Sequence, residues 1–385
     1  QIAFYDLFHT AGVDNFNIAV AATSGAGKSF LIQALILNVL SKNGRVWVID
    51  IGESYKKFCK TIQGTYLDAR HLHLNPFSHI HNIDESVEKI RDLLAVMASP
   101  SDSLDDVQKE YLAKAVKGAW HERQHDATID DVLKSLHTLS QEQTSSDFRL
   151  SDLVTLLERY GSTGSYGEIF NTTSELSVGT GFIVLELGAL NGNPALRKAV
   201  LFALILSIEE QMYGDTRSIQ KMCIIDEAWQ LLRGSNQQAS EFIARGFRTA
   251  RKHQGSFVTI SQGVKDYLGY AESEACCNNS DAKIIMRQND SAFKNFMDEN
   301  PNFYTPYQQT IIQSFQPARD NGFSEFMLTL GQGYSFHRLF VDPFSRVMFS
   351  SNAQEVSAVD QLCQQGLSYE EAILQVAKTN YGDEF

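Results

Sequence analysis

The sequence predicts an α/β protein with a mostly parallel central sheet and an inserted all-helical subdomain. Three observations lead to this prediction. An apolar strand, a glycine-rich loop, an apolar helix and a second strand follow one another over residues 15–52. Residues 83–176 carry helical spacings of three and four, and strand-like apolar runs return from residue 181. A strand, a helix and a further strand in this order form the repeating unit of parallel sheets.

Residues 1–82 are predicted to form the first part of the core. The segments NFNIAV (15–20) and RVWVIDIG (45–52) are short runs of apolar and β-branched residues, typical of buried strands. The segment between them (30–44) is apolar on all sides and ends at Gly44, which predicts a buried helix with a glycine cap. The stretch 64–77 continues as extended structure.

Residues 83–176 are predicted to form the helical insertion. Its segments DESVEKIRDLLAVMAS, LDDVQKEYLAKAVKGAWHERQ, TIDDVLKSLHTLSQEQ and RLSDLVTLLERY repeat apolar residues at helical spacing. Several of them begin with Asp, Thr or Ser, which favour the N-cap position. The glycine-rich stretch 160–170 then ends the helical pattern.

Residues 177–352 are predicted to form the second part of the core, and residues 353–385 a helical tail. Apolar strand patterns recur at 181–190, 221–229, 256–262, 281–288, 324–331 and 335–342. An apolar helix is predicted at 195–213 and a basic helix at 239–254, and the tail carries two short helices within 357–378.

Composition excludes some classes of protein. The chain has 385 residues, of which 43% are hydrophobic, so a packed core is expected. A net charge of -13 argues against attraction of nucleic acid or anionic lipid to the whole surface. The longest apolar run (199–208) is too short to span a bilayer. The five cysteines lack the spacing of a disulfide framework, which indicates reduced thiols in a cytoplasmic setting. The first residue is Gln, from which we expect the chain to be a fragment of a longer polypeptide.

Residues 22–29 (ATSGAGKS) match the phosphate-binding loop pattern G-x-x-x-x-G-K-[ST] except at Ala22. In that motif successive backbone N–H groups surround the phosphates, the lysine reaches the β and γ phosphates, and the hydroxyl binds magnesium. Ala22 costs little if its φ is negative and about 1–2 kcal/mol if it is positive. The predicted nucleotide-binding residues are Thr23, Ser24, Gly25, Ala26, Gly27, Lys28, Ser29 and Phe30.

Acidic and amide side chains follow two other predicted strands. Asp226 and Glu227 end the run CIIDE, where one carboxylate can hold Mg²⁺ and the next can polarise an attacking water. Gln262 ends the following strand and can orient that water. Arg248 and Arg251 share one face of the basic helix, either to neutralise phosphoryl charge in a neighbouring subunit or to pair with surface acids.

The chain resembles the C-terminal ATPase domain of the VirB4/TraC family of type IV secretion and conjugation ATPases. The stretches that carry the resemblance are SGAGKS, VIDIGESYKKF, LNPF, CIIDEAWQLL, FRTARKHQGSFVTISQ and FVDPFSRVMFSS. The resemblance implies a RecA-like P-loop NTPase core with a helical insertion, assembly into hexamers, and a separate N-terminal domain. It also implies docking beside a secretion channel, on the cytoplasmic face of the bacterial inner membrane.

The resemblance also implies a role for each site residue. Lys28 and Ser29 bind phosphate and metal, Asp226 holds the metal, and Glu227 is the catalytic base. Gln262 is the sensor, and Arg251, in preference to Arg248, acts in trans. The expected cofactors are ATP and Mg²⁺, and the expected partners are other copies of the chain and components of the secretion system at the inner membrane.

The function expected from these features is Mg-dependent ATP hydrolysis that energises pilus biogenesis or substrate transfer. Two alternatives stay open. A DNA-translocating hexamer, of the coupling-protein or FtsK/HerA-like kind, would show DNA-stimulated turnover with strong salt dependence. A nucleotide-gated assembly scaffold would keep full secretion when Glu227 is replaced by Gln.

Overall fold

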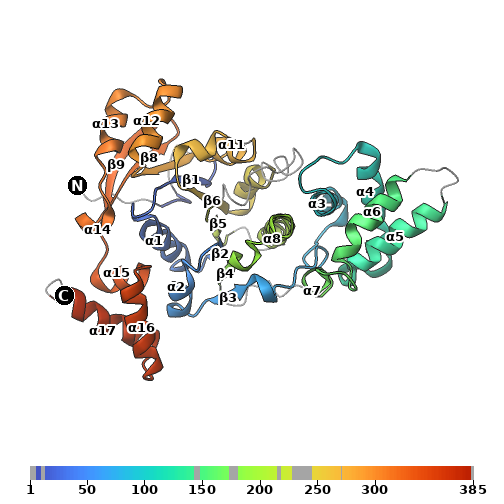
Figure 1. The fold of residues 1–385 in the computed structure, drawn as a ribbon, viewed down its shortest axis with the longest axis horizontal. Helices are drawn as coiled ribbons and strands as arrows, with labels where there is room; N and C mark the ends of the chain where they lie inside the picture. Colours follow the sequence, from blue (N-terminus) through green and yellow to red (C-terminus); the bar gives the residue numbers. More distant parts are fainter. Residues whose placement is uncertain are drawn as a thin grey trace.

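The computed structural model describes residues 6–9, 14–142, 148–172, 181–214, 218–227, 245–269 and 271–382. Its centre is a nine-stranded sheet in the order β3-β4-β2-β5-β6-β1-β7-β8-β9 (Figure 1). The strands are β1 (Ile18–Ala21), β2 (Arg45–Asp50), β3 (Thr65–Asp68), β4 (Phe182–Glu186), β5 (Lys221–Ile225), β6 (Gly255–Ser261), β7 (Ala282–Met286), β8 (Ser324–Leu330) and β9 (Gly333–Leu339).

The sheet is parallel from β3 to β7, and only β8 and β9 run antiparallel to their neighbours. This confirms the α/β class and the mostly parallel sheet that the sequence predicts. β1 lies between β6 and β7, with Ile18 beside Val258 on one side and Ala282 on the other. The carboxyl ends of β1, β5 and β6 therefore meet at one edge of the sheet.

Alternating apolar side chains bury both faces of the sheet. On β2, Val46 and Val48 belong to the core beneath one face, while Trp47 and Ile49 belong to the core beneath the other. The first face is covered by α1 (Lys28–Leu40), α2 (Lys56–Thr61), α15 (Pro343–Phe349), α16 (Ala353–Gln364) and α17 (Tyr369–Tyr381). The second face is covered by α8 (Pro194–Gly214), whose apolar run is almost entirely buried.

Helices fill the sequence between β3 and β4, within the range predicted for the insertion. They are α3 (Ile83–Ala98), α4 (Asp106–Arg123), α5 (Ile129–Glu142), α6 (Arg149–Leu157) and α7 (Gly167–Phe170). Figure 1 shows this group extending away from the sheet, with α3 nearest to α8. Asn82 caps α3, and Asp105 forms a capping box with Gln108 at α4. The division into domains at 82, 176 and 352 stays a prediction.

Several elements differ from the sequence prediction. β1 begins at Ile18, and at the preceding position the side-chain oxygen of Asn17 accepts from the N–H of Phe257 in β6 at 2.9 Å. Of the basic helix, residues 239–244 lie outside the described residues, and residues 245–249 are helical before a 3₁₀ turn at Ala250–His253. The sequence analysis missed α11 (Ala271–Asn278), α12 (Asp290–Glu299), α13 (Pro306–Ser314), α14 (Ala318–Asn321) and α15.

None of the helices in the described ranges combines the length and apolar character needed to cross a bilayer.

Candidate functional site

The loop after β1 has the geometry of an anion site. Gly25 and Gly27 adopt φ values of 79° and 89°, in the left-handed region where a side chain is strained. At Gly27 an added methyl group would also overlap the Ser324 hydroxyl. The loop leads directly into α1, whose first turn has no side-chain cap and no acidic residue. Its N-terminal N–H groups and helix dipole therefore favour a bound phosphate.

Ala22, the departure from the loop pattern, is accommodated without strain. Its φ is not positive, its side chain is buried, and its N–H donates to the carbonyl oxygen of Ser261 at 2.9 Å. Because φ is not positive, the replacement of glycine by Ala22 costs little conformational free energy.

The predicted acidic pair lies against the predicted lysine. Lys28 Nζ is 2.7 Å from Asp226 Oδ1 and 3.5 Å from Glu227 Oε1. Gln262 Nε2 donates to Glu227 Oε2 at 3.1 Å. Because β1, β5 and β6 are parallel neighbours, residues that follow each strand converge on one place. Four side chains that the sequence analysis selected are thus brought together.

Glu227 adopts an unusual backbone conformation. Its φ is 52°, in the left-handed region that residues other than Gly adopt uncommonly. Its N–H donates to Asp226 Oδ1 at 2.8 Å, which holds the turn after β5. Such strain at an acidic pair is typical of functional sites.

A buried group of acidic and phenolic side chains lies behind Asp226. Tyr55 Oη, fully buried, donates to Asp226 Oδ2 at 3.0 Å, and its pKa is raised well above the usual value by burial and by the charge of Asp226. Burial, followed by the charges of Asp226 and Glu186, raises the pKa of Asp50 to about 8. Burial lowers the pKa of Lys28, but the charges of Asp226 and Glu227 outweigh it and raise this pKa.

Replacing Asp50 by Asn is expected to change how stability depends on pH. The folded pKa of about 8 lies above the ordinary value of 3.8, so the stability conferred by protonated Asp50 is complete below about pH 4 and is lost as pH rises toward 8. Between pH 5 and 8, Asp50→Asn should gain on the wild type by up to about 1.4 kcal/mol per pH unit. Urea unfolding across this range measures the difference, and parallel curves would contradict the assignment.

The donors in this place suit magnesium. Ser29 supplies a hydroxyl at the start of α1, and Asp226 supplies a carboxylate held by Lys28 and Tyr55. Mg²⁺ prefers such oxygen donors and commonly takes only one or two from the protein, with waters and substrate phosphates as the rest. Accordingly, no cluster of three or more His, Cys, Asp or Glu ligands is needed, and none lies in the described residues.

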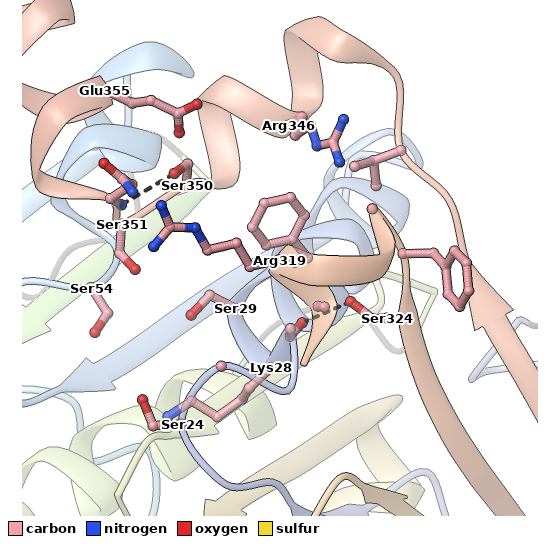
Figure 2. A pocket seen from close by; sticks show the side chains of 18 of the residues that line it. Ser24, Lys28, Ser29, Ser54, Arg319, Ser324, Arg346, Ser350, Ser351 and Glu355 are labelled. Atoms are coloured by element: carbon pink, nitrogen blue, oxygen red, sulfur yellow. Dashed lines mark hydrogen bonds between the residues drawn. The ribbon is translucent and has the colours of Figure 1, made fainter. Parts of the chain in front are cut away.

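A cavity of about 950 Å³ opens over the loop (Figure 2). Every predicted nucleotide-binding residue lines it except Ala26, which is buried, and Glu227 and Gln262 line it as well. Apart from Ala22 and Ser54, its remaining wall comes from the carboxyl-terminal third of the chain, and sequence analysis assigned none of those carboxyl-terminal residues to the site. They include Arg319, Ser324, Arg346, Asn352, Glu355 and Tyr381. Of these six residues, Arg346 alone lies in a stretch that carries the family resemblance, FVDPFSRVMFSS.

The two predicted trans-acting arginines do not reach this cavity within one subunit. Arg251 lies just before β6, at the opposite edge of the sheet, with Nη1 3.8 Å from Asp14 Oδ1. Arg248 is exposed on the preceding helical turn. The neighbouring Arg245 lies against the insertion, within 3.5 Å of Asp92 and 3.8 Å of Glu88.

Comparison with known proteins gives matches along the whole chain. Residues 3–380 match the family described as the TraG P-loop domain. The chain is 40% identical to Protein TraC of Escherichia coli (strain K12) over 394 residues, which cover 100% of this chain and 45% of TraC. The chain therefore spans less than half the length of this curated relative.

Two solved structures share the fold. VirB4 of Thermoanaerobacter pseudethanolicus superposes with a TM-score of 0.73 at 19% identity, covering 90% of this chain and 95% of that chain. The plasmid coupling protein TrwB in complex with ADP and Mg²⁺ gives a TM-score of 0.57 at 12% identity, covering 85% and 84%. At these identities the likeness concerns the fold, and it confirms the predicted P-loop core.

Proposed function

We propose that this chain, which belongs to the TraG P-loop domain family, binds ATP with Mg²⁺ and hydrolyses the bond between its β and γ phosphates. The match to TraC and the fold shared with VirB4 confirm the resemblance to the VirB4/TraC family indicated by the sequence. The observation that carries the proposal is the contact of Lys28 with both Asp226 and Glu227 beneath the loop cavity.

Each protein group has a role consistent with its position. The N–H groups of the loop and of the first turn of α1 bind the phosphates, and Lys28 transfers from Asp226 to the phosphate oxygens when they arrive. Ser29 and Asp226 would hold Mg²⁺, which neutralises phosphate charge when bound. Glu227 accepts the proton of the attacking water, while Gln262, bonded to Glu227, orients that water.

The wider role rests on the relatives. TraC is a member of a family of conjugation ATPases. We therefore propose that this chain supplies energy for pilus biogenesis or substrate transfer. Assembly into a hexamer would bring Arg251 or Arg248 of one subunit toward the cavity of the next, which fits their place at the opposite sheet edge. Association with secretion components on the cytoplasmic face of the bacterial inner membrane belongs to the same proposal.

Replacing Glu227 by Gln tests the catalytic part of the proposal. The amide keeps the shape of the side chain but cannot accept a proton, so turnover should fall about a hundredfold or more while ATP binding persists. Phosphate release with Mg·ATP measures turnover, and calorimetric titration with a non-hydrolysable analogue measures binding. Glu299→Gln, which changes an exposed acid that pairs with Lys265 and does not line the cavity, is the matched control. Unchanged turnover in Glu227→Gln would contradict the assignment.

A further inference from the structure

The segment around α14 is attached to the phosphate-binding loop of the same chain. Ala318 N–H donates to the carbonyl oxygen of Gly25 at 2.9 Å. The Ser324 hydroxyl, at the start of β8, donates to the carbonyl oxygen of Gly27 at 3.4 Å. These two bonds hold α14 directly beside the turn that is expected to receive the phosphates.

Arg319, the second residue of α14, extends into the cavity. Figure 2 shows its guanidinium above Ser29, on the side of the cavity toward Ser351. The side chain is exposed, and within the described residues its guanidinium forms no ion pair and no hydrogen bond. A cation held over a phosphate-binding loop without an acidic partner is available to an incoming anion.

The other two cations of the cavity are already engaged. Lys28 contacts Asp226 and Glu227, and the guanidinium of Arg346 stacks over the ring of Tyr381 at 4.6 Å. Arg319 is therefore the cavity cation whose charge is least compensated by the chain itself.

We propose that Arg319 binds the phosphate groups of the nucleotide held by the loop of its own subunit. The inference rests on the proposed function and adds a contact residue to that site. A guanidinium presents planar paired donors that match two phosphate oxygens, and such charge-assisted bonds are strong. Because α14 is bonded to the loop, Arg319 is positioned before any second subunit arrives, unlike Arg251 and Arg248.

Binding of a non-hydrolysable ATP analogue to Arg319→Gln tests the contact. The dissociation constant should rise about tenfold or more, and Arg319→Lys should lie between the variant and the wild type, because lysine keeps the charge but loses the paired donors. Arg70→Gln is the matched control, since Arg70 is an exposed arginine that pairs with Asp68 and does not line the cavity. It should bind as the wild type does.

Lys28→Ala separates failure of the inference from failure of the proposed function. If wild-type protein binds the analogue, Lys28→Ala does not, and Arg319→Gln binds normally, the role of Arg319 is wrong and the nucleotide site stands. If the wild type does not bind, the proposed function and the inference are both overturned.

Mixing two variants tests whether the arginine acts within its own subunit. In a mixture of Lys28→Ala and Arg319→Gln subunits, every cavity lacks one group if Arg319 acts in cis, so ATP turnover should stay at the level of the separate variants. If Arg319 acted across a subunit boundary, mixed neighbours would form complete sites, and recovered turnover would overturn the proposal.

Discussion

Lys28→Ala is expected to reduce ATP turnover by about a thousandfold or more and to remove most nucleotide binding. The change deletes the charge that reaches the β and γ phosphates, a contact that grows stronger as charge develops on them. Phosphate release under saturating Mg·ATP measures the effect. Turnover within tenfold of the wild type would contradict the assignment of this loop.

The same substitution affects the resting protein, so folding has to be controlled. Asp226 is almost fully buried and loses its cation in Lys28→Ala, and the donors that remain to it in the described part of the chain are Tyr55 Oη and the N–H of Glu227. Lys28→Ala combined with Asp226→Asn removes the uncompensated charge and should recover the lost stability without recovering turnover. Thermal unfolding of both variants, measured beside the turnover assay, distinguishes loss of the site from loss of the fold.

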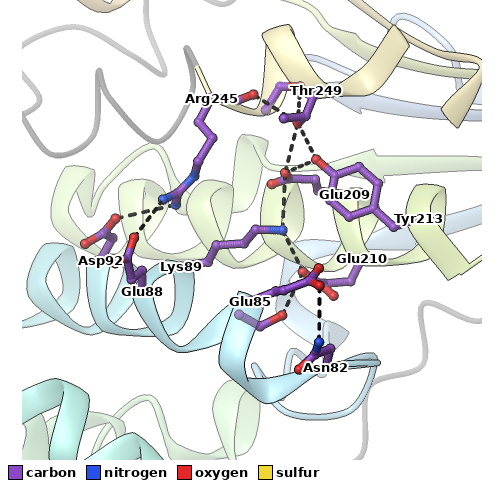
Figure 3. A network of polar contacts seen from close by, with 12 residues as sticks. Asn82, Glu85, Glu88, Lys89, Asp92, Glu209, Glu210, Tyr213, Arg245 and Thr249 are labelled. Carbon is purple, nitrogen blue, oxygen red and sulfur yellow. Dashed lines mark hydrogen bonds and ion pairs between the residues drawn. The ribbon is translucent and has the colours of Figure 1, made fainter. Parts of the chain in front are cut away.

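Lys89→Ala is expected to cost about 3–5 kcal/mol of folding free energy, the largest stability effect among these variants. Lys89 of α3 lies 2.8 Å from Glu210 and 3.3 Å from Glu209, both on α8, and all three side chains are buried (Figure 3). Ser86 also donates to Glu210, at 3.2 Å. Without Lys89 the two carboxylates remain buried and lose the cation that pairs with them among the described residues, a state that is strongly unfavourable for folding.

Chemical unfolding of Lys89→Ala beside Lys134→Ala measures this effect. Lys134 pairs with Glu122 at the same distance of 2.8 Å, but both side chains are largely exposed, so its removal should change stability little. Lys89→Met with Glu209→Gln and Glu210→Gln should recover part of the loss. Equal effects of the two lysine-to-alanine changes would show that burial of the first pair does not matter.

The network around Lys89 joins the insertion to the helical turn that precedes β6. Thr249, in the helical turn that leads to β6, contacts Tyr213 and Glu209 of α8. Arg245 of the same turn faces Glu88 and Asp92 of α3, where burial raises the pKa of Asp92. The insertion is thus held by charged contacts to the segment that ends, after β6, in Gln262.

The sequence predicted the elements whose signals are local. Parallel buried strands are continuous apolar runs, and polar residues at their carboxyl ends lie together in any such sheet, which is why Lys28, Asp226, Glu227 and Gln262 could be selected together. α13 also carries a local signal that the sequence prediction missed. Thr305 and Gln308 form a capping box, and Pro306 stands in the first turn of the helix.

The carboxyl-terminal wall of the cavity could not be predicted in the same way. Arg319 and Arg346 lie on short helices with no apolar period, and they reach the cavity only because β8 and β9 reverse direction beside β7. Their place depends on packing between segments distant in sequence. Likewise, the pairing of Arg251 with Asp14 follows from which strands are neighbours, a choice that no local pattern encodes.

The position of β1 in the sheet sets an order of events during synthesis on the ribosome. β1 and the phosphate-binding loop are synthesised before both strands that flank β1, which belong to residues 255–286. Until that part of the chain is made, an apolar strand has open edges on both sides and its loop lacks the bond from Ala318. The loop and the strand that carries it therefore acquire their full set of neighbours only after residues 255–318 have been added to the chain.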